Sequence, residues 1–266
     1  MKLIKKLGQV FANSKVLKKE IGLVDIKDKI ILEIGGGDGR LTKLLALKAK
    51  KVICIEKDKT YCKILKEKFK DNKKVLIMCG DFLKFPPRKI DLVFGNVPYC
   101  ISSNILFHLK KFNFEEAVLM FQKEFVLKIV AKENTKQYGF LSVVSQFYFN
   151  INLECIVSRT LFHPKPKVDS IIITLKKTNN KLDKKVEEII KFIFQHKKKT
   201  LKNALEDSYK KLKIPKKEVR IFTDSLKNAN KRVFKLTNEE IVDISKKVYI
   251  WEKKYSLTGE KKKENY

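Results

Sequence analysis

Three features of the sequence predict an α/β protein with a doubly wound sheet, followed by a smaller all-helical domain. Short apolar runs alternate with amphipathic helical patterns from Lys29 onward. These runs are continuously apolar, which is typical of parallel strands that helices cover on both faces. Beyond Lys177 the alternation stops, and only lysine-rich amphipathic helices follow. We therefore expect an α/β domain over residues 1–177 and a helical domain over residues 178–266.

The order of these patterns assigns each element of the α/β domain. The strands are expected in the segments KIILEIG, KVICIE, KVLIMCGD, KIDLVFGN, EEAVLMFQ and KVDSIIITLKK. Helices are expected between them in the segments RLTKLLALKAK, KTYCKILKEKFK and SSNILFHLKKF. The helical domain is expected to use the segment that begins LDKKVEEIIKFIF, then KKEVRIFTDSLKN and TNEEIVDISKKVYIWEKK, with a frayed tail TGEKKKENY.

Composition excludes several classes of protein. With 44% hydrophobic residues the chain has enough apolar material for a core, so it is not globally disordered. It has no run of about 18 apolar residues that could cross a membrane and no secretory signal pattern, so we expect a cytosolic protein. The five cysteines form no CxxC pair and lie in or beside apolar stretches, so we expect free, buried thiols. The three histidines are far apart in sequence, and no metal site is predicted.

The formal net charge of +30 indicates a polyanionic partner. A field of this sign attracts nucleic acid and makes the binding depend strongly on salt. Lysine bias in the composition is the alternative explanation, but such bias usually adds glutamate as well. Here 60 basic residues face 30 acidic ones, which favours nucleic acid over a merely solvated surface.

A glycine-rich turn in the segment LEIGGGDGRLT indicates a ligand site. Gly35 and Gly37 stand at alternate positions after the first strand, where glycine lets the backbone approach a ligand closely. The spacing differs from the dinucleotide fingerprint GxGxxG, so the turn alone is a weak signal. Glu56 and Asp81 end the next two strands, and ligands of open α/β sheets lie beyond the carboxyl ends of strands. Glu56 is suited to ribose hydroxyls and Asp81 to an adenine amino group, which indicates an adenosine-containing ligand.

The segment DLVFGNVPYC ends a further strand with an amide, a proline and an aromatic ring. Asn96, Pro98 and Tyr99 follow a buried-looking run in quick succession. The strand could simply end in a turn. Alternatively, these groups grip a flat molecule that carries an amino group.

Taken together, the segments EIGGGDGRLT, CIEKD, CGDFL and GNVPYCISS resemble Rossmann-like S-adenosylmethionine-dependent methyltransferases that act on adenine amino groups. The segments KKLGQVFAN, YGFLSVVSQFY, FHPKPKVDSIIITL and FQHKKKTLKNAL narrow the resemblance to KsgA-type dimethyltransferases of small-subunit ribosomal RNA. The similarity extends over nearly the whole chain. It implies dimethylation of two adjacent adenosines near the 3′ end of that RNA, with the pre-small ribosomal subunit as partner and the enzyme as a monomer.

The resemblance also implies residue roles. Asn96 and the backbone carbonyl of Pro98 would orient the target amino group, and Tyr99 and Phe162 would cover the two faces of the base. Phe162 could instead be an ordinary core residue. The cofactor would contact the glycine turn, Glu56 and Asp81, together with Val10, Ala12, Phe82 and Asn96. Val10 and Ala12 depart from the family pattern, which usually has Asn or His and then Leu at these positions, so cofactor affinity is expected to be weaker.

Several lysines are candidate RNA contacts because phosphate contacts position an RNA without reading its sequence. The candidates are Lys165, Lys167, Lys197, Lys198 and Lys199. The alternative for the last three is a solvated helix face.

Two other functions remain open from the sequence: methylation of another target, such as large-subunit RNA or DNA, and a non-catalytic assembly or transcription factor on the same fold. The intact residues Asn96, Pro98 and Tyr99 argue against the second.

Overall fold

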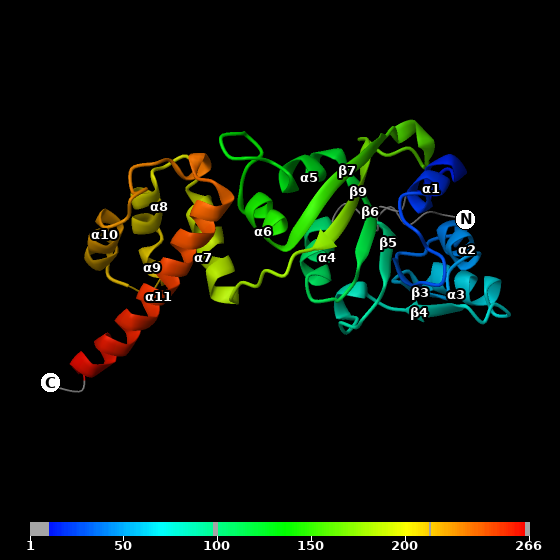
Figure 1. The fold of residues 1–266 in the computed structure, drawn as a ribbon, viewed down its shortest axis with the longest axis horizontal. Helices are drawn as coiled ribbons and strands as arrows, with labels where there is room; N and C mark the ends of the chain where they lie inside the picture. Colours follow the sequence, from blue (N-terminus) through cyan, green and yellow to red (C-terminus); the bar gives the residue numbers. More distant parts are fainter. Residues whose placement is uncertain (1–10, 98–100, 213, 264–266) are drawn as a thin grey trace. The chain divides into compact units, whose positions relative to one another are not determined.

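The computed structural model describes residues 11–97, 101–212 and 214–263, and its elements are shown in Figure 1. The strands are β1 (Phe11–Ala12), β2 (Ile30–Ile34), β3 (Lys51–Glu56), β4 (Val75–Cys79), β5 (Leu92–Asn96), β6 (Glu116–Gln122), β7 (Phe149–Val157), β8 (Phe162–His163) and β9 (Ser170–Lys177). The helices are α1 (Ser14–Ile21), α2 (Arg40–Ala46), α3 (Lys59–Lys68), α4 (Ser102–Leu109), α5 (Lys123–Ile129), α6 (Phe140–Tyr148), α7 (Lys184–Gln195), α8 (Leu201–Asp207), α9 (Tyr209–Leu212), α10 (Lys216–Asp224) and α11 (Asn238–Lys263). Three short 3-10 helices are η2 (Phe82–Lys84), η4 (Arg159–Leu161) and η5 (Val233–Lys235).

The chain divides into two compact units. The first contains residues 1–126 and 149–178, and the second contains residues 127–148 and 179–266. The sequence suggested one division between residues 177 and 178 and did not anticipate that residues 127–148 group with the C-terminal helices.

A seven-stranded sheet forms the centre of the first unit, in the order β4-β3-β2-β5-β6-β9-β7. The strands from β4 to β6 are parallel, as the apolar runs predicted, whereas β9 pairs antiparallel with both β6 and β7. The α/β prediction is confirmed, and the sheet is mixed because β9 runs antiparallel to its two neighbours, β6 and β7, so that β7 again runs in the direction of β6. All the parallel strands end at one edge, which gathers the residues that follow β2, β3, β4 and β5.

Burial of apolar side chains and capping by side chains explain where the helices of this unit form. One face of the sheet packs against α1 and α2 through residues such as Leu17, Leu45 and Val52, and α3 adds Leu65 beside Cys54. Side-chain caps begin the helices: Asn13 accepts the Val16 N–H at α1, and Asp58 accepts the N–H groups of Thr60 and Tyr61 at α3.

One expectation about the cysteines is wrong. Cys62 of α3 and Cys79 at the end of β4 form a disulfide, with Cα atoms 5.6 Å apart. Their sequence positions gave no sign of this pairing, because a helix and the following strand bring them together only in the folded sheet. Cys54 and Cys155 are free, whereas Cys100 lies outside the described residues.

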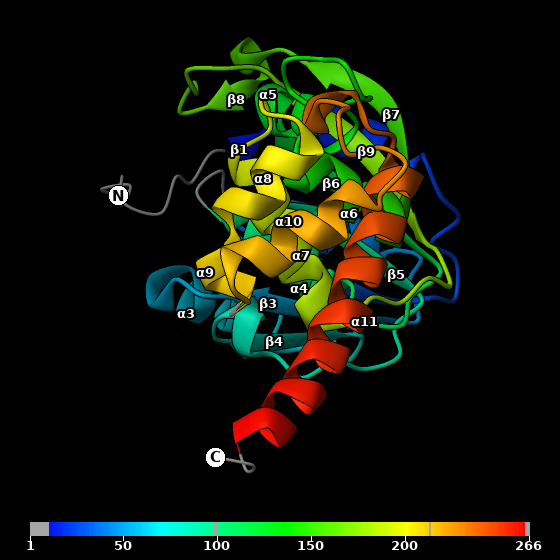
Figure 2. The same ribbon diagram turned by 90° about the vertical axis from the view of Figure 1, so that its left-hand side faces the viewer.

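In the second unit, α7 packs against α11 and α8, and α8 packs against α10; Figure 2 shows these helices. The segment 127–148 is connected to them by partly buried hydrogen bonds: Tyr138 donates to Asn238, and Asn238 in turn donates to Gln146. The long helix α11 continues to Lys263 and includes residues 258–263 of the tail that was expected to fray. No helix in the described part of the chain is long and apolar enough to cross a membrane.

Candidate functional site

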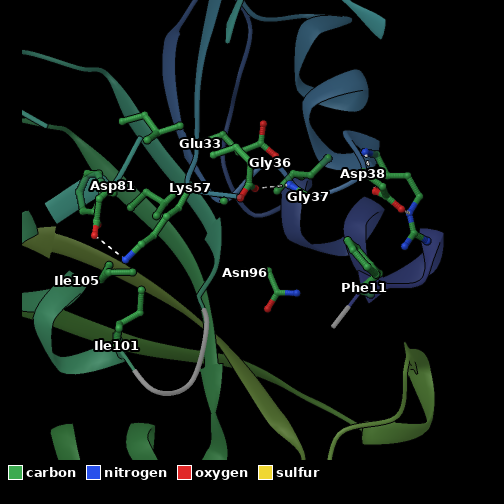
Figure 3. Close-up of a pocket in the computed structure, with 18 of the residues that line it drawn as sticks. Phe11, Glu33, Gly36, Gly37, Asp38, Lys57, Asp81, Asn96, Ile101 and Ile105 are labelled. Carbon is green, nitrogen blue, oxygen red and sulfur yellow. Dashed lines mark hydrogen bonds and ion pairs between the residues drawn. The ribbon is translucent and has the colours of Figure 1, made fainter. Parts of the chain in front are cut away.

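A pocket of about 260 Å³ opens at the carboxyl edge of the parallel strands, within the first unit. Seven of the residues singled out from the sequence line it, and they come from four strand ends and from β1: Ala12, Gly35, Gly37, Glu56, Asp81, Phe82 and Asn96. Figure 3 shows the Asn96 amide in the open centre of this pocket, with Phe11 on one side and Ile101 and Ile105 on another. Residues that follow four neighbouring strands therefore line one common cavity, as their positions at the strand ends predicted.

The turn after β2 has no room for a side chain at Gly36 or Gly37. Gly37 has φ +53°, and a Cβ atom there would lie 2.8 Å from the Phe11 ring. At Gly36 a Cβ atom would lie 2.3 Å from the Cys54 sulfur. Gly35, Gly36 and Gly37 therefore contribute only main-chain atoms to the pocket wall, which suits a ligand that packs against the backbone.

Glu56 connects this turn to the end of β3. One carboxylate oxygen accepts the Gly37 N–H at 2.8 Å, and the other accepts the Asp58 N–H at 2.7 Å. The residue is 7% exposed. Because a carboxylate has about four acceptor positions, two backbone bonds hold Glu56 in place and leave acceptors for ligand hydroxyls.

Asp81 follows β4 and is held at both oxygens. Oδ1 accepts the Leu83 N–H at 3.0 Å and caps η2, while Oδ2 lies 2.7 Å from the Lys57 ammonium. The Lys57 ammonium, more than any other group, lowers the pKa of Asp81 below its ordinary value. The carboxylate is therefore ionised at neutral pH and can act only as a hydrogen-bond acceptor.

Two buried acids, Glu33 and Glu20, interact electrostatically, and one of them belongs to the pocket lining. Glu33 of β2 lines it at 1% exposure, and Glu20 of α1 is 0% exposed. Burial raises the pKa of Glu33 to about 8, and burial together with repulsion from Glu33 raises that of Glu20 to about 8. Within the described part of the chain, both Glu20 oxygens and Oε2 of Glu33 lack a hydrogen-bond partner. At neutral pH the neutral, protonated form of these carboxyl groups is thus favoured.

Phe162 lies outside the pocket lining. It is 5% exposed and packs in the hydrophobic cluster with Ala12 and Val157. It is connected to the pocket through its backbone, because Ala12 pairs with Phe162 and Phe11 with His163 in the β1–β8 ladder. Val10, Pro98 and Tyr99 lie outside the described residues.

The predicted RNA-binding lysines occupy two places. Lys165 and Lys167 are exposed on the loop after β8, in the first unit. The other three precede α8 in the second unit, and they differ from one another. Lys197 donates to the carbonyls of Lys136 and Tyr138. Lys198 and Lys199 are both exposed, and Lys199 pairs with Asp207 at 2.6 Å.

Sequence reasoning missed part of the lining. Phe11 was overlooked although it stands between Val10 and Ala12, and its ring packs 5.6 Å from that of Tyr61. Lys57 directly follows Glu56, yet nothing in its position revealed that it would reach Asp81. Ile105 comes from α4 and Ile101 is its N-cap residue, and the approach of this helix to the pocket depends on the tertiary fold.

Comparison with known proteins decides the family. The family model described as ribosomal RNA adenine dimethylase matches residues 2–249. The chain belongs to this family. The similarity to KsgA-type enzymes that the motifs predicted is thereby confirmed.

Individual relatives of this ribosomal RNA adenine dimethylase agree with that assignment. A probable ribosomal RNA small subunit methyltransferase A of Thermococcus sibiricus is 41% identical over 244 residues, which are 90% of this chain and 89% of that protein. A protein of the same name from Methanococcus maripaludis is 37% identical over 260 residues, which are 94% of this chain and 97% of that protein. A crystal structure of a dimethyladenosine transferase from Plasmodium falciparum superimposes with a TM-score of 0.75 at 30% identity, covering 88% and 95%.

As a member of the family the protein is an S-adenosylmethionine-dependent methyltransferase that acts on adenine in ribosomal RNA. Its pocket fits this cofactor, since the bare glycine turn, the held carboxylate of Glu56 and the ionised Asp81 match an adenosine with its ribose. In the described residues no group of three or more His, Cys, Asp or Glu side chains is placed to hold a metal ion.

Proposed function

We propose that the protein transfers methyl groups to the exocyclic amino nitrogen of two adjacent adenosines near the 3′ end of small-subunit ribosomal RNA, during assembly of the pre-small subunit. The observation that carries this proposal is the position of Asn96. Its amide opens into the same pocket as Glu56 and Asp81, so an adenine amino group and a cofactor can meet there.

The cofactor would be held by groups that the fold already fixes. The acceptors left on Glu56 would bind the ribose hydroxyls, and Asp81 with the neighbouring Phe82 would bind the adenine. Ala12 and the turn at Gly35 and Gly37 would face the rest of the molecule. When bound, S-adenosylmethionine supplies a methyl group on a positively charged sulfur.

The target nitrogen is a poor nucleophile, because its lone pair is delocalised into the adenine ring. The side-chain oxygen of Asn96 would accept a hydrogen bond from one N–H of the target amino group and so hold that group in the pocket. The resemblance assigns a second acceptor to the Pro98 carbonyl and a stacking face to Tyr99. Proximity and preorganised acceptors suffice, since the nitrogen loses its proton to solvent after it is methylated.

The helical domain would bind the RNA or the ribosomal particle. The charge of +30 on the whole chain supports an RNA partner, because phosphate contacts supply most sequence-independent affinity. Lys165 and Lys167 in the first unit, and Lys197, Lys198 and Lys199 in the second, are the proposed contacts. We expect the enzyme to act as a monomer in the cytoplasm.

Transfer of labelled methyl groups to purified RNA tests this assignment of the target. Small ribosomal subunits that lack the two dimethyladenosines should accept about four methyl groups each, two on each adenosine, by the stoichiometry of the proposal. Large subunits and free DNA should accept none. Preferential labelling of large-subunit RNA would instead make the protein an adenine methyltransferase of that RNA.

A further inference from the structure

An ion pair lies across the adenine side of the pocket. The Lys57 ammonium, from the residue after β3, reaches Oδ2 of Asp81 at 2.7 Å, as Figure 3 shows. The Asp81 side chain is 20% exposed and the Lys57 side chain 55% exposed. Both residues line the pocket, so the ion pair forms part of the pocket wall and would contact a bound ligand.

The pair restrains Asp81 in a way that its backbone contact alone does not. The Leu83 N–H fixes Oδ1, and the carboxyl group could still rotate about that bond. The second contact, to Lys57, removes this freedom and keeps the group ionised. Two of about four acceptor positions are then occupied, and the others remain for a ligand.

From this geometry we propose that Lys57 is a positioning residue that aims the Asp81 carboxylate at the exocyclic amino group of the cofactor's adenine. This inference rests on the proposed placement of the cofactor and adds a specificity-determining residue to it. Lys57 acts through Asp81 and touches no reacting atom. An ordinary surface ion pair adds little to stability, so the effect of Lys57 is expected in ligand affinity and selectivity.

Calorimetry with S-adenosylhomocysteine tests the proposal in a double-mutant cycle of Lys57→Met, Asp81→Asn and the double variant. Methionine keeps the length of the lysine side chain and removes its charge. The matched control is Lys70→Met, because Lys70 is an exposed lysine of the same unit that pairs with Glu67 away from the pocket. Lys57→Met should weaken binding about threefold or more, and adding Lys57→Met to Asp81→Asn should weaken it little further.

Selectivity gives a readout that a purely structural role would not change. S-inosylhomocysteine carries an oxygen in place of the amino group, so the preference for the adenine form should fall in Lys57→Met and stay unchanged in Lys70→Met. Additive effects in the cycle, or tighter binding by Lys57→Met, would overturn the proposal, the latter because Lys57 would then compete with adenine for Asp81. Failure of the wild-type protein to bind S-adenosylhomocysteine would instead contradict the proposed cofactor placement.

Discussion

Ala12 and Phe162 are backbone neighbours in the two-stranded β1–β8 ladder. Ala12 lines the pocket assigned to the cofactor, whereas Phe162 is the residue proposed to cover the target base. The two proposed binding functions would therefore share one short antiparallel pairing. The buried position of Phe162 in the core cluster also means that its ring contributes to stability.

Substitution of Phe162 separates these two contributions. Phe162→Ala should lower the free energy of unfolding by about 3–5 kcal/mol, the usual effect of emptying an aromatic core position. Phe162→Leu keeps most of the apolar volume and should cost less than about 1.5 kcal/mol, yet it should still reduce methyl transfer because the stacking ring is gone. Denaturant unfolding and methylation assays measure the two effects. Unchanged turnover in Phe162→Leu would assign the ring to the core alone.

Glu56→Ala should weaken S-adenosylmethionine binding by roughly 1.5–3 kcal/mol, the range for hydrogen bonds to a charged group. The loss has two sources, since the carboxylate both faces the pocket and holds the Gly37 N–H. Calorimetry on this variant and on Glu67→Ala, an exposed acid of the same unit, provides the comparison. Equal affinity in the two variants would show that Glu56 does not bind the ribose.

The buried acids predict how stability depends on pH. The pKa of Glu20 is about 8 in the folded protein, well above the ordinary value of 4.5. Between these two values the unfolded chain is ionised and the folded chain keeps the proton, so stability falls as pH rises. Glu20→Gln should remove this effect and flatten the decline in unfolding free energy by about 1.4 kcal/mol per pH unit. Parallel pH profiles of variant and wild type would contradict the assignment.

Lys197 and Lys198, which precede α8, should respond differently when each is changed alone. Lys198→Ala should flatten the slope of log affinity for RNA against log salt by roughly 0.7 to 0.9 if the side chain contacts one phosphate. Lys197→Ala should mainly lower the melting temperature, because its ammonium satisfies two backbone carbonyls. Lys227→Ala, an exposed lysine of the same unit, is the control. The same salt slope in Lys198→Ala as in wild type would favour a solvated face and direct attention to Lys165 and Lys167.

Local patterns were sufficient for most of the fold and for the pocket. Continuous apolar runs located the parallel strands, and residues at strand ends, such as Glu56 and Asn96, converged because parallel strands end at one edge. The antiparallel β9 was not predicted to reverse direction, since its apolar pattern resembles that of a parallel strand. The Cys62–Cys79 bond and the Lys57–Asp81 pair join separate elements, and their geometry exists only after the sheet has formed.

Mass spectrometry of small-subunit ribosomal RNA tests the central claim most directly. The RNA would come from cells that lack the gene and carry either the wild-type protein or Asn96→Ala. Wild type should restore dimethyladenosine at two adjacent positions near the 3′ end. Asn96→Ala should restore none, although it should still bind S-adenosylhomocysteine, because Asn96 acts on the target amino group. Dimethyladenosine at wild-type levels with Asn96→Ala would contradict the account.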